Sequence, residues 1–236
     1  MSAGTVSSLY RWPVKSFAGE PIAATVLDRR GLAGDRAHAL FDRHKGAPRR
    51  LTIRQAPGML HWSAAYEGRI VAPDHLPLPR LTGPDGRSYA WDDPCLPAAL
   101  SEDLGRPVDL HRDPALMPDL ADSVLITTKA SLEAVGAGLG RPLDLRRFRP
   151  NIHVAFDAPA FAEEGWQGRR LQVGEAELEL LHPCERCVIP TRDPDTAAKH
   201  ADIIRWLVGE RANRFGINAR AVARASIAVG DAVQLI

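Results

Sequence analysis

The stretch Glu177-Leu178-Glu179-Leu180-Leu181-His182-Pro183-Cys184-Glu185-Arg186-Cys187 joins a strand pattern to a pair of cysteines. Residues 177–182 largely alternate polar and apolar side chains, as expected of a β-strand with one buried face. The residues after the second cysteine, Val188-Ile189-Pro190, do not begin a helix. Thiolates are soft ligands that suit transition metals. The stretch therefore predicts a strand that ends in a polar turn, where a cysteine beside Arg186 suits a metal or an oxidising reagent better than a core.

The residues before this stretch predict further short strands separated by Gly, Pro and Asp turn signals. In the first third of the chain the predicted strands are residues 6–10, 23–27, 37–42 and 61–66. Residues 73–97 are rich in proline, which excludes central strands and long helices but leaves room for a strand at residues 89–91. A short helix is predicted at residues 96–104, because Gly105 and Pro107 follow it.

A polar, proline-containing connection over residues 114–122 marks a predicted domain boundary, which divides the chain into residues 1–115 and 116–236. Beyond it, Thr128 is a predicted N-cap for a helix at residues 129–139, and a second helix is predicted at 202–215. The remaining predicted strands are residues 124–126, 152–156, 171–173, 219–223 and 231–235. The predicted fold class is therefore α+β with strands in the majority.

The composition excludes several classes of protein. With 236 residues, 45% hydrophobic residues and a net charge of +1, the composition indicates neither a disordered chain nor a nucleic-acid-binding protein. No apolar run approaches the roughly 20 residues of a membrane span, and the first residues lack a secretory pattern. Three cysteines are too few for a disulfide scaffold, so a reducing cytoplasm is the expected setting, with no membrane partner.

Taken alone, the C-x-x-C spacing of Cys184 and Cys187 leaves several interpretations open. A structural zinc site requires four ligands, and the chain has no second C-x-x-C pair. A thioredoxin-like pair requires a helix N-terminus, which the following residues do not predict. Two half-buried thiols also behave as small apolar side chains. Arg186 disfavours this last interpretation, because an apolar core has no need of a positive charge beside a sulfur atom.

Four segments in a shared order resemble the MOSC proteins, named for the molybdenum-cofactor sulfurase carboxy-terminal domain. They are Tyr10-Arg11-Trp12-Pro13-Val14-Lys15-Ser16, Gly31-Leu32-Ala33-Gly34-Asp35-Arg36, Phe148-Arg149-Pro150-Asn151-Ile152, and Cys184-Glu185-Arg186-Cys187 with Asp193-Pro194-Asp195-Thr196 after it. Thr52-Ile53-Arg54-Gln55 and Val229-Gly230-Asp231 also fit. Each segment is weak alone, and their common order is what makes the match specific. The branch that the chain resembles most is the amidoxime-reducing components and their bacterial relatives.

The resemblance implies an N-terminal β-barrel-like module in residues 1–115 and a MOSC β-barrel domain with a few helices in residues 116–236. It also implies a molybdenum cofactor, in which Cys187 is the thiolate ligand of a molybdenum ion held by a phosphorylated pterin (molybdopterin). Guanidinium groups, a helix cap and an amide suit the phosphate and the pterin edge. The expected cofactor-binding residues are Lys15, Ser16, Arg36, Arg54, Thr128, Ser131, Arg149, Asn151 and Arg186.

Thr191 and Asp193 are expected to line the open side of the metal, with Asp193 relaying protons. The role of Cys184 stays open: it could tune the metal-bound sulfur, carry persulfide sulfur, or do neither. The resemblance implies an oxidoreductase that reduces N-hydroxylated small molecules such as amidoximes, hydroxylamines and N-hydroxylated bases. Because the chain shows no ferredoxin domain, electrons are expected from a separate ferredoxin- or flavin-type protein. It also shows no pyridoxal-phosphate domain of the kind that precedes MOSC in the sulfurases. The alternatives are a sulfur or cofactor carrier that uses a cysteine persulfide, and a small zinc-binding interaction module.

Overall fold

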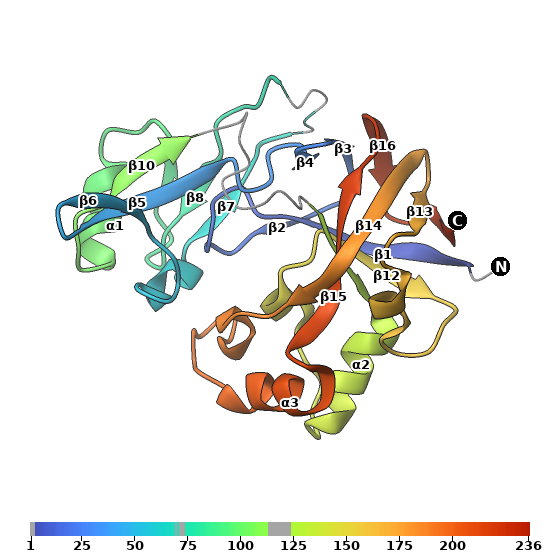
Figure 1. Ribbon diagram of the computed structural model, residues 1–236. Coiled ribbons are helices and arrows are strands. Elements are labelled where there is room, and N and C mark those ends of the chain that lie inside the picture. Colours follow the sequence, from blue (N-terminus) through green and yellow to red (C-terminus); the bar gives the residue numbers. More distant parts are fainter. Residues whose placement is uncertain (1–2, 69, 71–73, 113–123) are drawn as a thin grey trace.

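The computed structural model describes residues 3–236 except for 69, 71–73 and 113–123. In this part of the chain strands predominate, and there are three α-helices: α1 (Leu96–Asp103), α2 (Lys129–Gly138) and α3 (Ala201–Arg211). The predicted α+β class is confirmed. Figure 1 shows two lobes, one built around α1 and the other around a barrel of longer strands.

Seven strands close into a β-barrel, in the order β12-β11-β15-β14-β13-β17-β1 and back to β12. Their bounds are β1 Ala3–Arg11, β11 Val124–Thr128, β12 Ile152–Phe156, β13 Arg170–Val173, β14 Ala176–Glu185, β15 Arg214–Ala221 and β17 Ala232–Leu235. Only β11 and β12 run parallel, and α2 connects them and packs on both. A helical crossover is the usual connection of parallel strands. Both strands start at the same end of the sheet, so the connection must run back along the length of a strand, which a tight turn cannot do.

Apolar side chains on alternate strand positions fill the barrel. In β14, Ala176, Leu178 and Leu180 are buried, whereas Glu177 and Glu179 between them are partly exposed. Other strands contribute Val6, Leu9, Ile126, Ile152, Val154, Leu171, Val173, Ile217 and Val233 to the same core. Closure pairs both edges of every strand in the barrel, so the interior can be apolar throughout.

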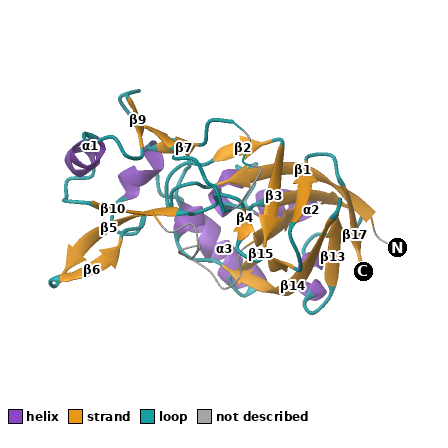
Figure 2. Ribbon diagram, turned by 90° about the horizontal axis from the view of Figure 1, so that it is seen from above, coloured by secondary structure: helices purple, strands orange, loops and turns teal. Residues whose placement is uncertain are grey.

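The other lobe consists of two three-stranded sheets around a second core. One sheet contains β5 (His38–His44), β6 (Ala47–Arg50) and β10 (Asp109–Arg112), and the other contains β7 (Ser63–Ala65), β8 (Arg80–Thr82) and β9 (Ser88–Ala90). The core between them includes Leu40, Leu51, Ile53, Met59, Trp62, Leu81, Leu96 and Leu100. Figure 2, turned by 90°, shows this lobe again apart from the barrel strands.

Residues from the start of the chain are built into the barrel. β1 pairs with β12 and β17, and β2 (Glu20–Ile22) pairs with its last residues. β3 (Ala24–Asp28) pairs with β4 (Gly31–Leu32) and with β16 (Ala225–Ala228), near the end of the chain. The loops between these N-terminal strands are therefore anchored at the barrel. The boundary predicted between residues 115 and 116 lies outside the described residues.

Most predicted elements are present, and the differences have local causes. Strands and helices occur where residues 6–10, 96–104, 129–139, 152–156 and 177–182 predict them. The helix predicted at residues 202–215 is too long, because Ala212 and Asn213 adopt left-handed backbone conformations that end it at Arg211. Phe215 lies in β15 instead, where it stacks on Phe148 with ring centroids 3.9 Å apart. The strand predicted at 61–66 is shortened to β7 by the 3-10 helix Pro57–His61.

Candidate functional site

A pocket of about 680 Å³ opens where the N-terminal loops meet the end of the barrel. Its lining comes from the loops after β1 and after β4, the β11 to β12 segment, and the β14 strand with the residues that follow it. The 3-10 helix Ala162–Trp166 and β15 complete the lining. Among the predicted site residues, those that line it are Lys15, Ser16, Arg36, Arg149, Asn151, Arg186 and Cys187. Segments more than a hundred residues apart therefore contribute to one concave site, as ligand pockets commonly require.

The end of β14 carries consecutive residues into this pocket. In a regular strand, neighbouring side chains point to opposite faces. The β14–β15 ladder shifts register between Leu180 and His182, and again between Pro183 and Glu185. Such irregularities re-aim side chains and are frequent beside functional sites. As a result, all residues from His182 to Cys187 line the pocket. In a regular strand, every second side chain would point to the opposite face of the sheet.

Arg186 lies between the two cysteines in sequence and places its positive charge beside the Cys184 sulfur. Its side chain is buried, its Nη2 donates to the Phe148 carbonyl oxygen at 2.7 Å, and its Nη1 lies 3.0 Å from the Cys184 sulfur. The sequence-based expectation of a positive charge beside a sulfur is thus met at Cys184. The half-buried Cys187 sulfur has no hydrogen-bond partner within the described residues, so its lone pairs are available to a ligand.

Three residues of the pocket wall share an uncommon backbone conformation. Ser16, Arg36 and Arg149 have φ values of 72°, 52° and 53°, in the left-handed region. For a residue with a Cβ atom this conformation costs about 1–2 kcal/mol, and such outliers tend to cluster at ligand sites. Tertiary contacts hold two of them in place: the Arg36 backbone N–H donates to the Trp12 carbonyl at 2.7 Å, and the Arg149 guanidinium lies 4.1 Å above the Trp12 ring.

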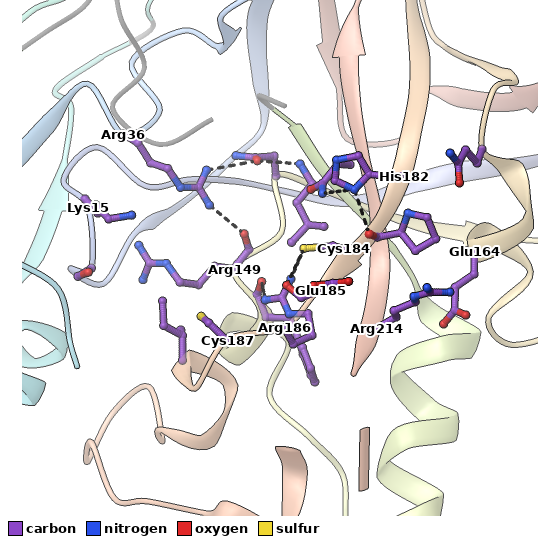
Figure 3. A pocket seen from close by; sticks show the side chains of 18 residues that line it. Lys15, Arg36, Arg149, Glu164, His182, Cys184, Glu185, Arg186, Cys187 and Arg214 are labelled. Carbon is purple, nitrogen blue, oxygen red and sulfur yellow. Dashed lines mark hydrogen bonds between the residues drawn. The ribbon is translucent and has the colours of Figure 1, made fainter. Parts of the chain in front are cut away.

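A hydrogen-bonded network orients the cationic side chains. The buried Asp35 carboxylate accepts the Trp12 backbone N–H at 2.7 Å and pairs with the Arg36 guanidinium. Arg36 also donates to the Asn151 Oδ1 at 3.4 Å and to the Arg149 carbonyl at 3.3 Å. Figure 3 shows Lys15, Arg36 and Arg149 on one side of the sulfur atoms, and His182, Glu164 and Arg214 on the other.

The pocket fits an anionic ligand rich in oxygen atoms. The charged residues that line it are the cations Lys15, Arg36, Arg149, Arg186 and Arg214, and the carboxylates Glu164 and Glu185. The Ser16 hydroxyl and the Arg186 Nε are buried, and neither has a hydrogen-bond partner within the described part of the chain. Leaving such a group unpaired costs about 1–3 kcal/mol. A bound phosphate or a carbonyl-bearing ring would satisfy both donors, so the residues present fit a phosphorylated pterin.

Thr128 and Ser131 do not reach the pocket. Thr128 is the N-cap of α2, as predicted, and its Oγ1 accepts the Ser131 backbone N–H at 3.2 Å. Both hydroxyls are buried and hydrogen-bonded to Glu163 Oε2, at 3.2 Å from Thr128 and 2.8 Å from Ser131. The N-terminus of α2 therefore contacts the carboxyl group of Glu163 and not an anionic ligand. Burial raises the pKa of Glu163, against the lowering effect of the Ser131 and Thr128 hydrogen bonds.

The other predicted residues outside the pocket are Thr191, Asp193 and Arg54. The Thr191 hydroxyl is buried and donates to the Val188 carbonyl at 2.7 Å. Asp193 pairs with Arg147 at 2.5 Å; burial raises its pKa, but backbone hydrogen bonds from Thr196 and Asp195, and Arg147, lower it overall. Arg54 is exposed on the loop after β6. A carboxylate so held is a poor proton relay, so the role expected for Asp193 lacks geometric support.

Sequence reasoning missed six residues that line the pocket: Glu164, Gln167, His182, Glu185, Arg214 and Asn218. A signal existed for two of them. Asn218 is a buried polar residue within the apolar run of β15, and His182 lies opposite it in the β14–β15 ladder. A polar side chain in an otherwise apolar strand requires a partner or a ligand. Glu164 and Gln167 depend on where the 3-10 helix Ala162–Trp166 packs, which no local pattern shows. Glu185 and Arg214 face each other at the end of the β14–β15 ladder, and this pairing is likewise a tertiary feature.

Comparison with known proteins agrees with this fold and shows the family. The chain belongs to the MOSC family: residues 111–234 match the MOSC domain, and residues 3–83 match the MOSC N-terminal beta barrel domain. It is 29% identical to the mitochondrial amidoxime-reducing component 1 of Xenopus laevis, over 82% of this chain and 67% of that protein. The human mitochondrial amidoxime reducing component 2 is also 29% identical, over 82% of this chain and 68% of its own length.

The likeness to a solved structure supports the fold. The YUAD protein from Bacillus subtilis superposes with a TM-score of 0.52 at 14% identity, covering 100% of this chain and 96% of that one. None of the described helices is long and apolar enough to cross a bilayer. In the same residues there is no group of three or more His, Cys, Asp and Glu side chains that could hold a metal ion. The cytoplasmic location stays a prediction, and the names of the two relatives refer to mitochondria.

Proposed function

We propose that this chain binds a molybdenum cofactor in the pocket and reduces N-hydroxylated small molecules. The observation that carries the proposal is the meeting, in one pocket of about 680 Å³, of the Cys187 thiol with a cationic wall from distant segments. Membership of the MOSC family and the similarity to amidoxime-reducing components support it. A separate protein supplies the electrons in this proposal.

Each part of the pocket has its own task in this proposal. The Cys187 sulfur would bind the molybdenum ion, for which thiolate is a suitable soft ligand. Lys15, Ser16, Arg36 and Arg149 would hold the phosphate and the pterin through charge-assisted hydrogen bonds. When bound, the cofactor supplies the two-electron chemistry that cleaves an N–O bond. The residues of the chain would bind the cofactor, orient the substrate and exclude water from both. Preorganised groups of this kind stabilise charge without having to rearrange during the reaction.

The decisive experiment compares Cys187→Ala with Cys95→Ala. Cys95 is exposed in the other lobe and does not line the pocket, so it is a matched control for losing a thiol. Both proteins would be analysed for molybdenum and pterin, and for anaerobic reduction of benzamidoxime by a chemical reductant. We expect Cys187→Ala to lose metal and turnover, and Cys95→Ala to keep both. Equal rates in Cys187→Ala and the wild type would rule out the enzyme as proposed.

The carrier interpretation has a different outcome in the same experiment. Cys184 and Cys187 both line the pocket, and Arg186 lies beside the Cys184 sulfur. If the purified protein contains cyanide-labile sulfur but neither molybdenum nor pterin, a persulfide carrier accounts for the site better than a reductase. Stoichiometric molybdenum together with turnover supports the reductase.

A further inference from the structure

The proposed reaction requires a source of protons in the pocket. An N-hydroxylated substrate takes up two electrons and two protons, the N–O bond breaks, and the oxygen leaves as water. An external donor protein, or a chemical reductant in its place, supplies the electrons. The protons must come from water through a side chain near the substrate. Asp193 is outside the pocket and is held by Arg147, so another group must deliver them.

The carboxylates of the pocket are less suited to this task. Glu164 accepts from Arg211 at 2.7 Å and 3.4 Å, one contact to each oxygen. Glu185 lines the wall beside the cysteines. Side-chain carboxylic acids ordinarily ionise near pH 4, so few of them carry a transferable proton at neutral pH. An imidazole ordinarily changes charge between pH 5 and 8. His182 is the histidine that lines the pocket within the described residues.

The contacts of His182 place its two ring nitrogens in different roles. Nδ1 lies 3.1 Å from the Pro183 carbonyl oxygen and 3.4 Å from the side-chain amide of Asn218. A carbonyl oxygen only accepts, so the shorter contact requires that Nδ1 carries a hydrogen. The Asn218 amide, turned about its last bond, would place its oxygen toward the same hydrogen. Nε2 is then the nitrogen that takes up and releases a proton.

The structure also gives His182 a supply of protons and a fixed position. Its side chain is exposed, so solvent can recharge it. It lies on the irregular end of β14 opposite Asn218, which is buried on β15. The charged groups that share the pocket with it are Lys15, Arg36, Arg149, Arg186, Arg214, Glu164 and Glu185. Cations therefore outnumber carboxylates around this histidine.

We propose that His182 is a catalytic residue that delivers a proton from Nε2 to the oxygen leaving the substrate, and that Asn218 positions its ring. This inference rests on the proposed reductase function. The test uses the cofactor-loaded wild type, His182→Gln, and His44→Gln as control. His44 is an exposed histidine at the end of β5 in the other lobe. Gln keeps hydrogen-bonding capacity but does not titrate, so the comparison isolates proton transfer.

Three measurements follow on each protein. Molybdenum and pterin content should be equal in all of them. With benzamidoxime and a chemical reductant, kcat of His182→Gln should be about 10²-fold or more below that of the wild type, with little change in KM. The wild-type kcat should decline as the pH rises, whereas kcat of His182→Gln should not. In ¹⁵N-histidine NMR spectra of the wild type, the resonance that His182→Gln removes should show the Nδ1–H tautomer, whether or not cofactor is bound.

Each contrary outcome has a distinct meaning. Unchanged kcat and pH profile in His182→Gln would overturn the assignment and leave the reductase function intact. A lower cofactor content in His182→Gln would make the histidine a cofactor-binding residue instead of a proton donor. An Nε2–H tautomer would contradict the arrangement of the ring. A loaded wild-type protein without turnover would overturn the reductase function, and this inference with it.

Discussion

Replacing Arg149 separates the contribution of its side chain from that of its backbone. The guanidinium donates from Nη1 to the Phe17 carbonyl at 2.7 Å and lies 4.1 Å above the Trp12 ring. A hydrogen bond from a charged donor contributes about 1.5–3 kcal/mol, and a partly buried cation–π contact about 0.5–2 kcal/mol. Arg149→Ala should therefore lower the free energy of unfolding by about 2–5 kcal/mol, and should also weaken cofactor retention.

Arg149→Gly loses the same contacts but should be more stable than Arg149→Ala. The backbone at this position has a φ of 53°, which costs a residue with a Cβ about 1–2 kcal/mol and glycine almost nothing. After the greater flexibility of glycine in the unfolded chain is subtracted, we expect an advantage of about 1 kcal/mol. For a protein of this size, that difference corresponds to a rise in Tm of about 2–4 °C.

The assay is urea unfolding of cofactor-free protein, with an Ala and Gly pair at Arg220 as control. Arg220 lies in β15, half-exposed, and is not among the residues with positive φ. There the order should reverse, with Gly less stable than Ala by about 0.5–1 kcal/mol. If Gly is also the less stable substitution at residue 149, the left-handed backbone inferred for the pocket wall is wrong.

Two pH-dependent effects are expected from buried groups outside the pocket. Burial lowers the pKa of His38 to about 3, so the unfolded chain binds its proton first, and stability should fall as the pH drops below about 6.5. His38→Gln should reduce the loss of unfolding free energy between pH 7.5 and pH 5 by about 2 kcal/mol, and an unchanged loss would refute this. Burial raises the pKa of Glu163, so the wild type should lose stability as the pH rises through that pKa, and Glu163→Gln should not. Thermal melts from pH 5 to pH 8 would measure this, and parallel curves for the two proteins would contradict it.

Local pattern was sufficient to predict several elements and one part of the site. The alternation of residues 177–182 and the two cysteines after it predicted a strand that ends at a reactive sulfur, and β14 ends at Glu185 with Cys187 in the pocket. The N-cap at Thr128 also followed from local chemistry. These features depend on neighbours in the chain, for which spacing and residue type carry the information.

Two predicted site residues lie outside the pocket and contact groups that are distant in sequence. Thr128 has the chemistry of an anion site, yet Glu163, 35 residues later, occupies its hydroxyl. Asp193 has the chemistry of a proton relay, yet Arg147 holds it away from the pocket. In both cases the residue type was compatible with the expected role, and a partner brought by tertiary packing decided otherwise.

Short-range periodicity predicted the strand-rich class, and motifs in a shared order predicted the family and the cysteine that lines the pocket. Which cations surround that cysteine depends on long-range packing, because they come from segments far apart in the chain. Three of the residues that line the pocket, Ser16, Arg36 and Arg149, have left-handed backbone conformations. This conformation is uncommon for serine and arginine, so the residue types do not predict it. The pairing of β1 with both β12 and β17 closes the barrel, and it brings the N-terminal loops to the pocket that contains the sulfur atom.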